Sequence, residues 1–70
     1  MTPEQRVFLV ECIARDQESV LAFEEARWEA ELDPDAPRYT PGAIEHYIQM
    51  RDLCVERIAY YRSLLKEETS

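Results

Sequence analysis

The residues of this chain that could carry chemistry are a single histidine, His46, and two cysteines, Cys12 and Cys54. A zinc site needs several His, Cys or carboxylate ligands close together, yet neither a Glu-x-x-His nor a His-x-x-x-His spacing surrounds His46. No serine or cysteine has a recognisable histidine base, and the chain has no glycine-rich phosphate loop. We therefore predict no catalytic, metal-binding or cofactor-binding residue, and a protein that is not an enzyme. His46 is expected to be a surface or interface residue.

The two cysteines fall on opposite sides of a proline-rich segment centred near Ala36 and Pro37. If the chain folds back on itself there, residues that lie level with each other have numbers that add up to about 73. Cys12 and Cys54 fall short of that sum, which separates them by roughly 10 Å along a helix axis. Because a disulfide requires much closer Cα atoms, we predict two reduced, buried thiols. A redox switch between subunits is the alternative interpretation.

The segment from Asp33 to Gly42 determines how all other residues are positioned. It holds three of the four prolines and the only glycine, the residue types that interrupt helices. On both sides of it, apolar residues recur at the spacings of an amphipathic helix. We therefore predict an all-α fold with one domain over 1–70. It is an antiparallel two-helix hairpin, with helices at about 3–32 and about 41–67 and a loop at 33–40.

Each predicted helix begins with a similar signal. Thr2 is suited to cap the first helix, Pro3 to its first position, and Gln5 completes a capping box. Thr40 and Pro41 repeat the cap and the proline, so we predict that the second helix begins at Pro41.

Each predicted helix carries two apolar stripes. On the first helix, one stripe comprises Leu9, Cys12, Ile13, Val20, Phe23, Ala26 and Ala30, and the other comprises Val7, Val10, Ala14, Leu21, Trp28 and Leu32. On the second helix, the main seam comprises Ile44, Tyr47, Arg51, Cys54, Ile58, Tyr61 and Leu65, and the other stripe comprises Met50, Leu53, Arg57, Tyr60 and Leu64. A hairpin buries one stripe of each helix, and monomers rarely expose stripes of this extent. We therefore predict a homodimeric four-helix bundle. Pairing with a different protein would bury the same surface.

The net charge of −7 is unevenly distributed. Residues 3–32 contain eight acidic residues and three arginines, for −5, whereas 41–70 contain five acidic and four basic residues, for −1. This balance argues against direct binding to nucleic acid or to an anionic membrane, both of which attract basic surfaces. Glutamates spaced seven apart, Glu4, Glu11, Glu18 and Glu25, follow one face of the first helix. They form either a solvated face or an acidic ridge for a basic partner.

Large aromatic residues and arginines are the types that most often anchor protein interfaces. In this chain they gather on the second stripes, in the loop and on the first turns of the second helix. The predicted interface residues are Val10, Leu21, Arg27, Trp28, Leu32, Arg38, Tyr39, His46, Met50, Arg57 and Tyr60. The competing interpretation is that the aromatic residues fill the core of the hairpin or dimer.

In length, in helix number and in the two Thr-Pro starts around the Asp33–Gly42 segment, the whole chain resembles the phage quorum-sensing anti-activators, short two-helix proteins that dimerise. The resemblance implies a phage-encoded inhibitor that binds a host protein. That protein would be a LuxR-type transcription activator, bound at its ligand-binding domain so that DNA binding is blocked, and a pilus-assembly ATPase is a second implied target. No functional residue is carried over, because the shared features are those of layout.

Two other functions fit the same pattern. The acidic first helix is compatible with a nucleic-acid mimic, such as an anti-CRISPR or anti-restriction inhibitor, although its glutamates repeat more sparsely than phosphates along a strand. A structural subunit of a larger assembly is the other. No unbroken apolar run is longer than that from Val7 to Val10, which is too short to cross a membrane, and no signal-peptide pattern opens the chain. We therefore expect a cytoplasmic protein.

Overall fold

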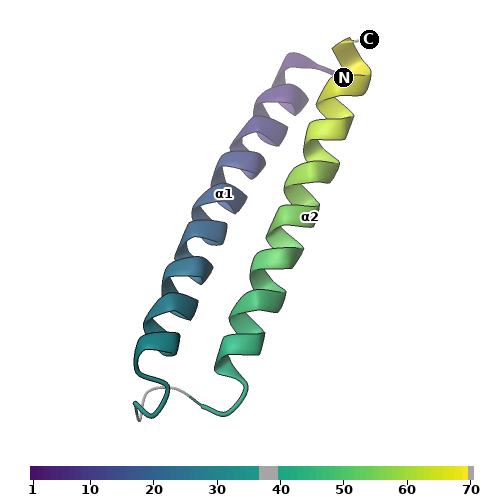
Figure 1. The fold of residues 1–70 in the computed structure, drawn as a ribbon. Coiled ribbons are helices and arrows are strands. Elements are labelled where there is room, and N and C mark those ends of the chain that lie inside the picture. Colours follow the sequence, from purple (N-terminus) through teal and green to yellow (C-terminus); the bar gives the residue numbers. More distant parts are fainter. Residues whose placement is uncertain (37–39, 70) are drawn as a thin grey trace.

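The computed structural model describes residues 1–36 and 40–69, with side chains as far as Glu67. Two α-helices, α1 (Pro3–Leu32) and α2 (Ala43–Thr69), pack against each other as an antiparallel hairpin with extents of 49 × 15 × 14 Å (Figure 1). The prediction of an all-α fold with two packed helices is confirmed. The loop residues Arg38 and Tyr39, both predicted at an interface, lie outside the described residues.

The start of α1 is fixed by the predicted capping box. The Thr2 hydroxyl accepts a hydrogen bond from the Gln5 N–H at 3.1 Å, and the Gln5 side-chain oxygen accepts one from the Thr2 N–H at 2.9 Å. Two backbone donors that the first turn leaves unpaired are thereby satisfied. The helix ends at Leu32, because Pro34 keeps the preceding residue, Asp33, out of helical geometry.

The start of α2 differs from the prediction. Gly42 has a φ of +83°, a left-handed conformation that no right-handed helix contains, so α2 begins at Ala43 rather than at Pro41. The Ala43 N–H donates to the Thr40 carbonyl at 3.1 Å, which closes a turn with Pro41 and Gly42 at its centre. Proline followed by a positive-φ glycine is the signature of a type II turn. The Gly42 carbonyl then accepts the first helical hydrogen bond, from His46, at 2.9 Å.

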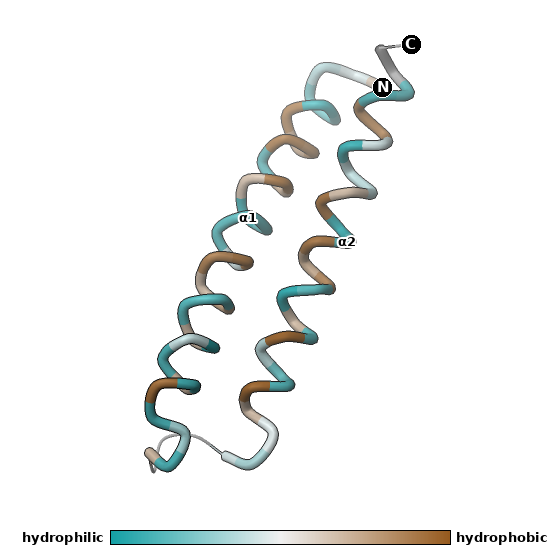
Figure 2. Tube along the Cα trace, in the orientation of Figure 1, coloured by the Kyte–Doolittle hydropathy of each residue, from teal (hydrophilic) through white to brown (hydrophobic). Residues whose placement is uncertain are grey.

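The two helices meet along one seam, formed by the α1 residues of the stripe that begins at Leu9 and by the main seam of α2; the sequence had left open which stripes would pair. Its buried apolar residues are Leu9 and Ala30 on α1 and Cys54 and Ile58 on α2. The remaining seam residues are half-buried, as expected when only two helices cover each other. Figure 2 shows apolar bands recurring along the full length of both helices, far more than this narrow core uses.

The predicted register is also correct. Asp16 contacts Arg57, a pair whose numbers add up to 73, and Glu24 lies 3.8 Å from Arg51 across the hairpin. Cys12 and Cys54 are free thiols, as predicted from their offset. Only Cys54 is fully buried, however. Cys12 is half-buried, as most seam residues are when only two helices cover each other, which corrects the prediction of two buried thiols.

Neither helix, over the residues that the structure describes, has a stretch that is long and apolar enough to cross a membrane.

Candidate protein-interaction surfaces

The most unusual feature of the hairpin is the amount of apolar surface that it leaves exposed. Among the residues whose side chains the structure describes, ten large apolar residues are at least 45% exposed, whereas four apolar residues are buried. The exposed ones are Met1, Val7, Phe8, Val10, Leu21, Trp28 and Leu32 at the start of the chain and along α1, and Leu53, Val55 and Tyr60 on α2. Small monomeric proteins seldom carry so many. These residues are therefore the first candidates for a binding function.

The α1 stripe predicted as the interface is open to solvent throughout. Val10 is 52% exposed, Leu21 66%, Trp28 62% and Leu32 68%. Trp28 is consequently not a core residue of the hairpin, and the core interpretation could hold for it only in an assembly of more than one chain. We call Val7, Val10, Ala14, Leu21, Trp28 and Leu32 the α1 stripe.

A groove of ≈ 500 Å³ runs between the helices beside this stripe. The stripe contributes Leu21 to its lining, and the other lining residues are Gln17, Val20, Val55, Ile58, Ala59 and Arg62. Five of the seven lining residues are apolar, so the groove can accept large apolar side chains. The sequence pattern had given Ala59 and Arg62 no role.

The second exposed stripe of α2 lies on the other side of the hairpin. At about 100° per residue, Leu53 and Tyr60 point roughly 130° away from the groove-lining Val55 and Ala59 around the α2 axis. The same geometry turns Phe8, which is 62% exposed, toward the side of Leu53 and Tyr60. We call Phe8, Met50, Leu53, Tyr60 and Leu64 the α2 face. Within it, Met50 and Leu64 are half-buried.

The predicted interface residues thus divide between two surfaces, and the structure does not bring them together as one. Val10, Leu21, Trp28 and Leu32 belong to the α1 stripe, whereas Met50 and Tyr60 belong to the α2 face. His46 is exposed near the loop end of α2, with its ring 6.0 Å from that of Tyr47.

Arg27 belongs to the interior of the hairpin more than to its surface. Its side chain is 33% exposed, and its Nε atom is buried without a hydrogen-bond acceptor, 3.8 Å from the Glu31 carboxylate. It takes a seam position in the series Val20, Phe23, Arg27, Ala30, which follows steps of three and four. Arg27 therefore lies at the margin of the seam, half-buried, and is a poor candidate for an exposed anchor.

Arg57 has a structural partner that the sequence did not reveal. Its guanidinium donates two hydrogen bonds to the Asp16 carboxylate, from Nε at 3.2 Å and from an Nη at 2.8 Å. The same Nη lies 3.5 Å from the Cys54 Sγ. Hydrogen bonding to Asp16 raises the pKa of Arg57 above its ordinary value. Such two-point pairing fixes geometry as well as charge, so Arg57 sets the register of the hairpin although its side chain is 55% exposed.

Asp16 is buried, with 7% of its surface exposed, and it continues the α1 seam between Ile13 and Val20. The apolar pattern of α1 does not include it, because an aspartate interrupts the apolar residues of the stripe. The unbroken steps of four, three and four from Leu9 to Val20 were the signal that could have placed it in the seam. Over the described residues, no group of three or more His, Cys, Asp or Glu side chains could hold a metal ion.

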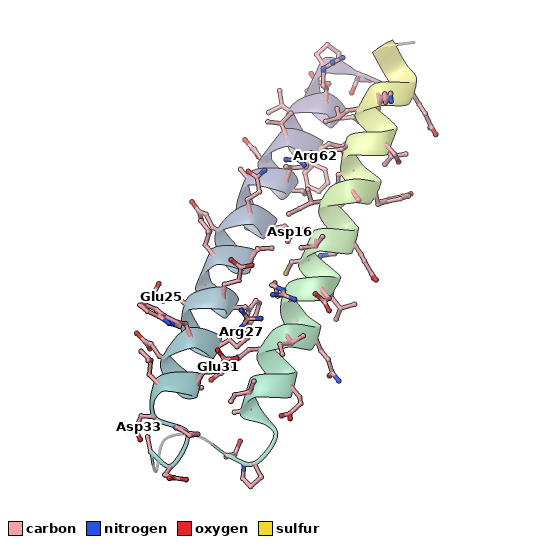
Figure 3. All side chains as sticks on the ribbon, viewed as in Figure 1. Asp16, Glu25, Arg27, Glu31, Asp33 and Arg62 are labelled. Atoms are coloured by element: carbon pink, nitrogen blue, oxygen red, sulfur yellow. The ribbon has the colours of Figure 1, made fainter. Side chains whose placement is uncertain are left out.

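Exposed acidic residues border the α1 stripe on both sides. Glu11, Glu18 and Glu25 follow one border, and Glu24 and Glu31 follow the other. Figure 3 shows Glu25 on the side of α1 that faces away from α2, whereas Asp16 and Arg62 lie between the ribbons. Glu24 and Glu31 lie 3.8 Å from arginines of the hairpin. Within the described part of the chain, Glu11, Glu18 and Glu25 have no cationic partner.

No protein-family model matches this chain, and neither a curated protein nor a solved structure shows significant similarity to it. The exposed surfaces of the hairpin are therefore the features from which a function is inferred.

Proposed function

We propose that this protein is a non-enzymatic regulator that forms a homodimer and inhibits another protein by binding to it. The observation that supports this function is the exposure of large apolar residues on two separate sides of the hairpin. Within the described part of the chain ten such residues are exposed, whereas four apolar residues are buried. A hairpin of this size has little core to stabilise it. A second copy on one side and a target protein on the other would cover both surfaces.

The dimensions of the hairpin suit a dimer. One side measures 49 by 15 Å, which gives roughly 700 Å² for each protomer and about 1,500 Å² in total. That total falls within the range of specific, stable protein interfaces, about 1,200–2,000 Å². Two hairpins in contact along such a side form a four-helix bundle.

Charge favours the α2 face as the dimer contact. Residues 41–70 have a net charge of −1, against −5 for residues 3–32, so two copies repel each other less through α2 than through α1. The α1 stripe then remains free for the target. An inhibitor of this kind would act as the phage anti-activators do, by occluding a surface that a transcription activator or another host protein needs.

The dimer is tested by light scattering at micromolar concentration, where we expect about twice the chain mass of 8.3 kDa. Leu53→Glu places a charge in the proposed contact and should yield a monomer, whereas Leu21→Glu, the matched change on the α1 stripe, should leave a dimer. A well-folded wild-type monomer would show that the dimer proposal is wrong.

Target binding is tested by affinity purification from bacterial lysate with wild-type protein and the Trp28→Ala variant, followed by an activity assay of any retained protein. We expect a protein that the wild type retains and inhibits and that the variant releases. Retention of the same proteins by both forms would exclude the α1 stripe as the inhibitory site.

A further inference from the structure

We infer that the α1 stripe and its groove bind a basic amphipathic α-helix of the target protein, which lies along α1 as a third helix. This inference rests on the proposed function, because it names the chemistry of the target at the surface already assigned to it. It follows from the length of the stripe, from the groove beside it and from the charges on its borders.

The shape of the stripe is that of a helix-docking surface. Its exposed members follow one another at steps of three, four and seven, the spacing at which two packed helices meet. Between Val10 and Leu32 the stripe extends for about 33 Å, the length of a helix of about 22 residues. A surface of this length and straightness fits a partner helix better than a compact loop.

The groove supplies the position for an anchor. It opens beside Leu21, halfway along α1, and its volume of ≈ 500 Å³ is lined by Val20, Leu21, Val55, Ile58 and Ala59. This volume accepts large side chains but not a whole helix. A docked helix would therefore rest on α1 and insert one or two apolar residues between the helices, as grooves that bind amphipathic helices do.

The charges beside the α1 stripe indicate which charged residues should flank the apolar face of the partner helix. Glu18 and Glu25 border the stripe on one side and have no cationic partner among the described residues, and Glu24 borders it on the other. A helix with Lys or Arg on both flanks of its apolar face would pair with these carboxylates. A second copy of this chain would instead bring two acidic α1 helices together, which is unfavourable at close range. Arg62 is the one basic residue of the groove lining, so an acidic residue of the partner helix that reaches the groove would form an ion pair with it.

Trp28 provides a direct test, because it is the only tryptophan of the chain and lies within the stripe, 62% exposed. The probe is a synthetic 22-residue peptide of Leu, Ala and Lys, with apolar residues at helical spacing and Lys on both flanks. A matched peptide carries Glu in place of Lys. We expect the Lys peptide to shift the Trp28 emission to shorter wavelength with a dissociation constant in the micromolar range, and the Glu peptide to leave it unchanged.

Two variants separate docking from simple charge attraction. Leu21→Glu adds a negative charge, so attraction alone would strengthen binding of the Lys peptide, whereas loss of the apolar anchor should weaken it about 10-fold or more. Gln49→Glu adds the same charge on the solvent side of α2 and should change the binding of the Lys peptide less than about twofold. Glu18→Lys should weaken binding about fivefold, against no change for Glu56→Lys on the solvent side of α2. Circular dichroism confirms that each variant is helical.

Four results would overturn the inference. Equal binding of both peptides, or binding unaffected by Leu21→Glu, would show that no basic helix docks in the groove. Binding of the Glu peptide alone would reverse the charge of the partner but leave the protein-binding function intact. A shift of Trp28 emission on raising the protein concentration without peptide would identify a second copy as the occupant. Failure of the proposed function itself is recognised separately, by the light scattering and the inhibition assay.

Discussion

Replacement of Gly42 by alanine tests how the hairpin loop joins the second helix. In the structure Gly42 has a φ of +83° and closes a turn before α2 begins. No atom lies within 4 Å of an added Cβ, so a clash makes no contribution. The cost comes only from the backbone, because an L-residue in a left-handed conformation is disfavoured by about 1–2 kcal/mol.

If α2 instead began at Pro41, as its Thr-Pro start suggests, Gly42→Ala would stabilise the protein rather than destabilise it. Gly42 would then be a helical residue, and alanine would stabilise the helix by about 0.5–1 kcal/mol. The two arrangements therefore differ by about 2 kcal/mol and in direction. For a domain of this size, a change of 1 kcal/mol moves the melting temperature by about 4–8 °C.

The assay is thermal unfolding followed by circular dichroism, at one protein concentration because a dimer's melting temperature depends on it. We expect Gly42→Ala to lower the melting temperature. Gly42→Asn is the control, because asparagine tolerates the left-handed region better than other non-glycine residues. Gly42→Asn should therefore lower the melting temperature less than Gly42→Ala does. A higher melting temperature for Gly42→Ala than for wild type would refute the turn and restore Pro41 as the first helical residue.

Three further expectations concern the core, the exposed tryptophan and the thiols. Ile58→Ala should lower the free energy of unfolding by about 2–4 kcal/mol and Val55→Ala by less than about 1 kcal/mol, because Ile58 is buried and Val55 half-exposed; chemical denaturation measures both, and equal losses would contradict the seam. Trp28→Ala should leave the helical content intact while target binding falls tens-fold; an unfolded variant would place Trp28 in a core. Reductant should not change the melting curve, and a thiol reagent should modify Cys12 before Cys54, since only Cys54 is fully buried; the reverse order would contradict the burial of Cys54.

The helix bounds show which local signals are decisive and which are ambiguous. The capping box at Thr2 and the break at Pro34 have one structural meaning each, and α1 has the predicted bounds of Pro3 and Leu32. Thr40-Pro41-Gly42 has two, since Thr-Pro favours a helix start and Pro-Gly favours a type II turn. The glycine decides between them, because its left-handed conformation is available to few other residues.

The candidate surfaces could be predicted in part. The sequence contains both exposed stripes, because helical periodicity separates them from the seam. It could not show that they lie on opposite sides of the hairpin, since that depends on how the helices are rotated in the seam. The groove residues Ala59 and Arg62 were missed for the same reason, because they become neighbours of Leu21 only after the helices pack.

Both ends of the described chain lie at the same end of the hairpin, opposite the loop (Figure 1). A force applied between Met1 and Thr69 therefore separates the two helices from their open end. The layers of the seam then break one after another rather than all together. The few buried apolar layers resist weakly, and the Asp16–Arg57 pair adds one two-point contact near the middle. Such a hairpin is mechanically soft, and an unfolding motor that grips either end would need little work to extract it. A tightly bound helix on α1 would raise that mechanical resistance.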